Sequence, residues 1–245
     1  MPLAWLDTFR PFTLQHAVCG GACLAIMFGV SYLGLSLKRK SGADSVASDC
    51  MRLAIGWLGI AYWIGSNIWW NWPGNYDLQR SLPIQVCDLA GLIGPLALLI
   101  RARALRAITY FWGIALSTQG FIQPVLTKGA AYTEFWLFWA NHTIVVGTAV
   151  YDVIARGFRP AWRDYFLAAA AILAYLVIIL PIDIVWHLNY GYVGNTTPEN
   201  RTIIDDLGPW PLRILPLSVI ALGVMAAIQV PWVVAARRSR VAPNA

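Results

Sequence analysis

A thiol and a carboxylate stand side by side at Cys87 and Asp88, at the start of a long apolar run. An ionisable side chain is costly inside a bilayer, so such a residue is a functional-site hypothesis by default. A cysteine becomes a nucleophile for acyl carbonyls when a nearby neutral histidine stabilises its thiolate. His142 and His187 are the histidines that could serve. Adjacent helical residues project about 100° apart, so if Cys87 faces a cavity, Asp88 braces a neighbouring helix, or the reverse.

The same polar residues allow other interpretations. A zinc ion held by histidines and carboxylates, with one open position, would activate water for hydrolysis. The candidate ligands are His16, Asp88, His142, Asp183 and His187. No HExxH or CxxC spacing supports this site. Intramembrane Asp and His residues also relay protons in transporters, but no inverted repeat is visible here. Finally, Cys87 could be a packing thiol, as we expect for Cys19 and Cys23.

The composition is that of a polytopic membrane protein. The 245 residues are 58% hydrophobic and only 12% charged, with a mean hydropathy of +0.58 and 13 Trp. A soluble domain of this length could not hide so much apolar surface. The net charge of +6 sits in short basic clusters between apolar runs, which indicates membrane topology rather than nucleic-acid binding. The first run lacks a small-residue cleavage site, so we expect a retained helix rather than a signal peptide.

Seven apolar runs are long enough, at roughly 20 residues, to span a bilayer. They predict an all-α, seven-helix transmembrane bundle forming a single domain over residues 1–245, with spans at 13–37, 51–70, 83–100, 105–123, 133–155, 165–187 and 211–235. Pro83 fits the first turn of its helix. Alternate loops carry 13 of the 18 basic residues, and the other loops hold Arg10, Arg80, Lys128, Arg201 and Arg213. The positive-inside rule therefore predicts an external N-terminus and a cytoplasmic C-terminus.

With this orientation, the polar residues of the spans gather in the outer half of the bundle. They are His16, Asn67, Gln85, Cys87, Asp88, Gln119, Gln123, Asn141, His142, Asp183 and His187. Because unsatisfied polar groups are costly in hydrocarbon, the cluster predicts a cavity open to the extracytoplasmic face. Interhelical hydrogen bonds are the alternative. Asp183 and His187 are four residues apart and should share a helix face and hydrogen-bond, and Gln119 and Gln123 have the same spacing.

Several motifs resemble those of the YwaF-like bacterial integral membrane proteins, a group related to the eukaryotic transmembrane protein 164 acyltransferases. The motifs are Leu82-Pro83-Ile84-Gln85-Val86-Cys87-Asp88-Leu89, Tyr110-Phe111-Trp112-Gly113 with Thr118-Gln119-Gly120, Asn141-His142, Asn189-Tyr190-Gly191-Tyr192 and Leu207-Gly208-Pro209-Trp210-Pro211. The resemblance implies a multi-pass lipid acyltransferase with a nucleophilic Cys87 and a histidine, His142. Asp183 and His187 belong to none of these motifs.

Together these features lead to a hypothesis of an intramembrane transacylase. His142 would deprotonate Cys87, which attacks a lipid ester to form a thioester. Asn141 and Gln85 are candidate oxyanion donors, Asp88 would orient a histidine, and Gln119, Asp183 and His187 would support the site. We expect membrane lipids as substrates, no cofactor, no nucleic acid or protein partner, and residence in the bacterial inner membrane. The alternatives are a zinc-dependent lipid hydrolase with His16, His142, His187 and Asp183 as ligands, and a non-catalytic lipid or solute carrier.

Overall fold

In the computed structural model, which describes residues 4–42, 45–195 and 203–241, the chain is all-helical, as predicted. The long helices are α2 (Leu14–Ser41), α3 (Val46–Trp70), α4 (Val86–Ile100), α7 (Thr133–Ile154), α8 (Trp162–Trp186) and α9 (Ile214–Val241). The short ones are α1 (Ala4–Asp7), α5 (Arg103–Tyr110), the π-helix η1 (Phe111–Leu116), α6 (Gln119–Ile122) and the 3₁₀ turns η2 (Tyr190–Tyr192) and η4 (Ile203–Leu207). The described segments contain no strand, only an isolated bridge between Thr8 and Lys128.

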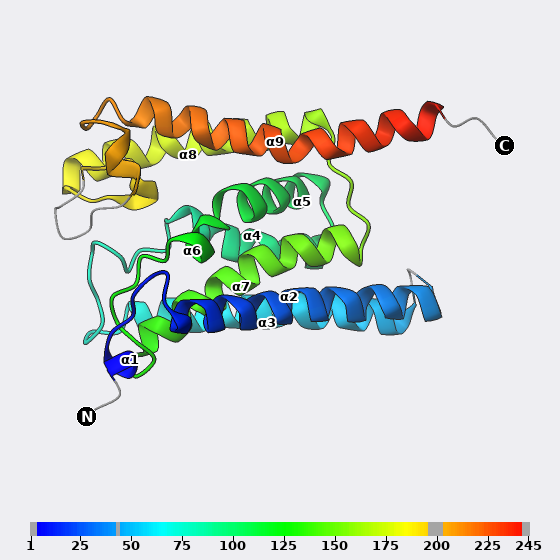
Figure 1. The fold of residues 1–245 in the computed structure, drawn as a ribbon, viewed down its shortest axis with the longest axis horizontal. Coiled ribbons are helices and arrows are strands. Elements are labelled where there is room, and N and C mark those ends of the chain that lie inside the picture. The colour runs from blue at the N-terminus through cyan, green and yellow to red at the C-terminus, as the bar shows by residue number, and fades with distance from the viewer. Residues whose placement is uncertain (1–3, 43–44, 196–202, 242–245) are drawn as a thin grey trace.

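The helices lie in three layers along the long axis of the molecule (Figure 1). Helices α8 and α9 form one outer layer, α4 and α5 lie in the middle, and α2, α3 and α7 form the other outer layer. The short elements α1, α6, η2 and η4 gather at the end of the molecule where the N-terminus lies. The C-terminus lies at the opposite end.

Within the described residues, four helical segments are long and apolar enough to cross a bilayer: Leu14–Ser41, Thr133–Ile154, Trp162–Trp186 and Ile214–Ala236. Helix α4 is apolar but shorter. These segments indicate a multi-pass membrane protein. The count of seven spans and the orientation of the termini remain predictions.

The predicted span at 105–123 is wrong as a continuous helix. The chain leaves α5 through the π-helix η1, where the Ser117 N–H donates to the Trp112 carbonyl five residues earlier, at 2.9 Å. After α6, Gln123 leaves the helix with φ −133° and ψ 80°. A π-turn contains one residue more than an α-helical turn, and such turns often mark functional sites. The break places residues 117–123 at one end of the middle layer instead of in a regular helix.

Two predicted helix ends also shift. Helix α4 begins at Val86, so Pro83 lies before the helix and not in its first turn. The Tyr190 hydroxyl donates to the Leu78 carbonyl at 2.7 Å and accepts the Leu82 N–H at 3.1 Å, and so holds the preceding segment in a turn. Helix α8 ends at Trp186, because His187 takes a left-handed conformation at φ 54° and caps the helix.

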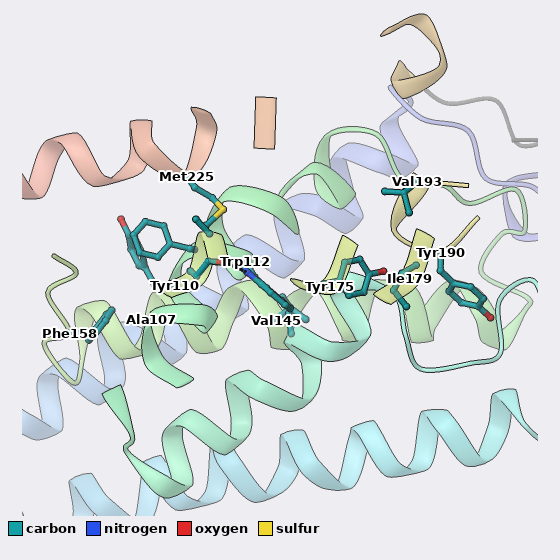
Figure 2. Packing of buried hydrophobic residues seen from close by; sticks show 14 of the residues in the cluster. Ala107, Tyr110, Trp112, Val145, Phe158, Tyr175, Ile179, Tyr190, Val193 and Met225 are labelled. Atoms are coloured by element: carbon teal, nitrogen blue, oxygen red, sulfur yellow. Dashed lines mark hydrogen bonds between the residues drawn. The ribbon is translucent and has the colours of Figure 1, made fainter. Parts of the chain in front are cut away.

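The main apolar core joins the middle layer to α8 and α9. Figure 2 shows it running from Phe158 at one end, past Trp112 and Val145, to Tyr190 and Val193 at the other. A second cluster, Phe9, Cys23, Met27, Phe135, Trp139 and Val146, joins α2 to α7. A third, smaller cluster consists of Leu98, Tyr151 and Ala155. The buried apolar residues of the described segments thus form several clusters along the bundle rather than a single central core.

Buried ion pairs hold the loops at the far end of the bundle. Arg103 is bidentate to Asp164 at 2.9 and 2.7 Å, and Arg106 is bidentate to Asp152 at 2.8 and 2.9 Å. Both carboxylates are buried, and two parallel N–H···O bonds make this the strongest kind of charged hydrogen bond. These pairs link α5 to α7 and α8, and sequence analysis did not find them.

Removing the Asp152 charge should destabilise the fold. We expect Asp152→Asn to lower the free energy of unfolding by about 3 kcal/mol, because Arg106 then loses its charged partner in a mostly buried position. The check is thermal or denaturant unfolding of the purified protein in detergent micelles. The exposed pair Arg80–Asp77 supplies the control: Asp77→Asn should cost less than about 1 kcal/mol. Equal stability of Asp152→Asn and the unchanged protein would contradict the prediction.

Candidate functional site

A cavity of about 550 Å³ lies among α3, α4, α6, α7, α8, α9 and η2. Its polar lining includes Tyr62, Ser66, Asn67, Gln85, Cys87, Asp88, Ser117, Gln119, Gln123, Asn141, His142, Tyr175, Asn189 and Tyr192. Gln85, Cys87, Asp88, Gln119, Asn141 and His142 thus border one space. Nothing in their spacing alone required this, since they come from three separate segments.

Cys87 is the second residue of α4, at the positive end of the helix dipole. The N–H groups of Val86 and Cys87 lie in the first turn and have no carbonyl partner within the helix, and among the described residues no carbonyl outside the helix accepts them. Free N–H groups at a helix start stabilise negative charge on a nearby thiolate or oxyanion. The Sγ atom lies 3.9 Å from Oδ1 of Asp88. A thiol becomes a nucleophile only as its thiolate, so a base on the cavity wall is needed to make Cys87 reactive.

His142 has the geometry of such a base. Its ring is buried, and Nδ1 lies 2.9 Å from the Phe138 carbonyl one turn earlier. A carbonyl only accepts, so Nδ1 carries the proton and Nε2 keeps a free lone pair. On that side the ring packs directly against Gly120, where an added Cβ would overlap Nε2 and Cδ2. Gly120 therefore leaves the space that the imidazole occupies.

The face of α4 that carries Cys87 is turned toward α7. Gly91 lies one turn after Cys87 on the same face, and a Cβ there would stand 2.8 Å from Oδ1 of Asn141. On the other side, the Trp63 indole donates to the Asp88 carbonyl at 2.9 Å. The short helix is thus fixed between α3 and α7, with Cys87 on the side of the Asn141-His142 pair.

The η2 turn closes the site from a third side. Oε1 of Gln85 accepts the Gly191 N–H at 2.7 Å, which leaves only the NH₂ group of Gln85 as an oxyanion donor. Gly191 has φ 62° and packs so tightly on the Tyr175 hydroxyl that no larger residue would fit. Burial raises the pKa of the neighbouring Tyr192, and the charges that Cys87 and Asp88 can carry raise it further. Tyr192 therefore stays a neutral hydrogen-bond donor beside the thiol.

Three predicted residues do not join the cavity. His16 is satisfied by backbone: Nδ1 accepts the Phe12 N–H at 2.9 Å, and Nε2 lies 2.8 Å from the Phe121 carbonyl. Asp183 is buried behind η2, where Oδ1 accepts the Tyr190 N–H at 3.0 Å. His187 is exposed, because it sits in the left-handed cap beyond the end of α8. The predicted Asp183–His187 hydrogen bond is therefore wrong.

The zinc hypothesis loses its geometric basis for the same reason. His16, His142, His187 and Asp183 lie in different environments, and His16 uses both ring nitrogens. Among residues 4–42, 45–195 and 203–241, no group of three or more His, Cys, Asp or Glu side chains could hold a metal ion. We do not carry this alternative further.

Sequence analysis did not single out several polar residues of the lining, among them Tyr62, Ser117 and Tyr192. Tyr62 donates to the Leu137 carbonyl at 2.5 Å, which ties α3 to α7 beside the cavity. Ser117 lies between two of the motifs, and Tyr192 lies within another. Their places near or in motifs were a usable signal, but hydroxyls occur so often in helices that type alone does not single them out.

An all-helical, multi-pass membrane protein with a partly polar cavity inside the bundle is the class that fold and site define. A family model matches residues 11–229, and the chain belongs to the TMEM164 family. No curated protein and no solved structure matches the chain. The family match confirms the predicted relationship to transmembrane protein 164, and it extends over nearly the whole chain.

If His142 activates Cys87, moving its ring should slow the thiol. We expect Gly120→Ala to reduce the alkylation rate of Cys87 by iodoacetamide about tenfold, because the new methyl group displaces the imidazole and lowers the thiolate fraction. The rate is measured by mass spectrometry in a protein whose Cys19, Cys23 and Cys50 are replaced by alanine. Gly65→Ala, where the added methyl meets nothing within 4 Å, is the matched control. An unchanged alkylation rate in Gly120→Ala would show that His142 does not activate Cys87.

Proposed function

We propose that this protein is an intramembrane lipid acyltransferase of the transacylase type, with Cys87 as nucleophile and His142 as base. One observation carries the proposal: the thiol and the imidazole with a free Nε2 line one cavity, and both project from helices that the packing holds in place. A nucleophile and a base on one cavity are the minimum that acyl transfer through a thioester requires.

The rest of the cavity wall suits a lipid substrate. Helices α8 and α9 contribute an apolar side made of Ile172, Leu173, Leu176, Leu217, Ile220, Ala221, Leu222 and Val224. Ile220 and Val224 are 48% and 40% exposed while also lining the cavity. This wall therefore borders both the cavity and the lipid-facing surface, and an acyl chain could enter sideways. At the other end of the cavity, Arg80 and Lys128 provide a polar border for a head group.

In the first half-reaction, Nε2 of His142 takes the Cys87 proton and the thiolate attacks an ester carbonyl carbon of a phospholipid. The C–S bond forms, and the ester C–O bond then breaks. The leaving lyso-lipid oxygen takes the proton from His142. The negative charge on the carbonyl oxygen would be met by the free Cys87 N–H at the start of α4, with the amides of Asn141 and Gln85 as further donors.

In the second half-reaction, His142 removes a proton from an acceptor hydroxyl, which attacks the thioester carbonyl. The C–O bond forms, the C–S bond breaks, and the thiolate regains its proton. Because the site faces the extracytoplasmic side under the predicted topology, the donor is a phospholipid rather than cytosolic acyl-CoA. The resemblance to YwaF-like bacterial membrane proteins supports the bacterial inner membrane as the location.

The test is acyl exchange in proteoliposomes that contain a phospholipid with a labelled acyl chain and an unlabelled lysophospholipid. We expect Cys87→Ala to reduce transfer by at least about 10³-fold, because the covalent route is removed. The labelled acyl group should also appear on Cys87 of the unchanged protein by mass spectrometry.

Cys23→Ala is the matched control, since Cys23 is a buried thiol in the α2–α7 cluster, outside the cavity lining. It should transfer at the normal rate. Full turnover by Cys87→Ala would reject the nucleophile. Lipid binding without any transfer by the unchanged protein would favour a carrier.

A further inference from the structure

One buried hydroxyl on the cavity wall has no hydrogen-bond partner among the described residues. Ser117 is 4% exposed, lines the cavity, and its Oγ makes no hydrogen bond within the residues that the structure describes. A buried hydroxyl without a partner costs free energy and calls for an explanation. A ligand that fills the cavity would supply the missing bond.

Other hydroxyls on the helices bond to a backbone carbonyl four residues earlier. Ser31 donates to Met27, Thr143 to Trp139, Thr148 to Ile144 and Ser218 to Ile214, at distances of 2.7 to 2.8 Å. Even the adjacent Thr118 donates to the Ile114 carbonyl at 2.6 Å. Ser117 therefore differs from these hydroxyls, which are satisfied locally by backbone carbonyls.

The π-helix accounts for this difference. The carbonyl four residues before Ser117 belongs to Gly113, and the Ser117 N–H bonds instead to the Trp112 carbonyl, one residue further back. The Thr118 hydroxyl also approaches the Gly113 carbonyl, at 3.4 Å. The wider turn thus removes the usual acceptor from Ser117 and leaves its side chain on the cavity wall. Wide turns of this kind recur at functional sites.

Ser117 also lies close in the chain to the candidate base. Its carbonyl accepts the Gly120 N–H at 3.1 Å, which closes a tight turn, and Gly120 packs on the His142 ring. One turn of chain therefore carries both the packing surface for the imidazole and the unpartnered hydroxyl.

We propose that Ser117 is a substrate-contacting residue whose hydroxyl donates a hydrogen bond to an ester carbonyl oxygen of the bound lipid. This inference rests on the proposed function, because it takes the occupant of the cavity to be an ester lipid. It adds a contact that binds and positions the ester, without a covalent role for the serine.

Binding can be measured apart from catalysis in a Cys87→Ala protein, purified in detergent micelles. The probes are dioleoylphosphatidylglycerol and its diether analogue, which lacks both ester carbonyls but keeps the head group and chains. We expect the ester lipid to bind about tenfold more tightly than the diether, as one hydrogen bond would give. Adding Ser117→Ala should remove that preference, because it should weaken binding of the ester lipid and leave binding of the diether unchanged.

Thr118→Val is the matched control, since the Thr118 hydroxyl is already bonded to backbone. It should keep the ester preference. Without lipid, Ser117→Ala should melt no lower than its parent, because its hydroxyl has no protein partner to lose. A lower melting temperature would reveal such a partner and overturn the inference.

The remaining outcomes separate the two proposals. If the parent binds both lipids equally well, the carbonyl contact is refuted while lipid binding stands. If Ser117→Ala keeps the ester preference, a different residue makes the contact and the inference fails. If the parent binds neither lipid, the proposed function fails and the inference falls with it.

Discussion

The close approach of α4 to its neighbours is the constraint on which the site depends. Glycines let the backbones meet: a Cβ at Gly59 would overlap Pro95 of α4, and a Cβ at Gly94 would overlap the Thr148 side chain of α7. Membrane helices associate through such small residues, because hydrocarbon provides no hydrophobic drive to hold them together. With α4 fixed on both sides, the face that carries Cys87 and Gly91 has one orientation, toward α7.

Hydrogen bonds from tyrosine hydroxyls stabilise the segment that precedes α4. Within a bilayer, backbone groups outside a helix must find partners in the protein. Tyr190 satisfies the Leu78 and Leu82 backbone, and Tyr175 donates to the Ile84 carbonyl at 2.8 Å. These bonds stabilise the irregular segment before Val86 and place the free N–H groups of the helix start beside Cys87. The η2 turn and the start of α4 are thus coupled, because Tyr190 belongs to η2 and its hydroxyl bonds the backbone just before α4.

Hydropathy and periodicity predicted the long helices well, because apolar length is a property of single segments. The π-helix was not predictable in this way: Phe111–Leu116 is as apolar as a regular helix, and its contacts with α9 and α7 join segments far apart in the chain. The same limit explains His187: helical spacing placed it beside Asp183, but α8 ends at Trp186 and His187 itself takes the left-handed conformation. The pairing of Arg106 with Asp152 links residues 46 positions apart, for which local patterns carry no information.

The buried carboxylates of Asp152 and Asp164 differ from polar side chains on the cavity wall in how their hydrogen-bonding groups are satisfied. The two carboxylates each receive two guanidinium hydrogen bonds. Two side chains that border the cavity keep free capacity: the Nε2 of His142 and the hydroxyl of Ser117. A fold that satisfies buried charges so completely in one place does not lack the means to do so in another. Polar groups left unpaired on a cavity wall are best explained by a ligand whose own polar atoms complete them.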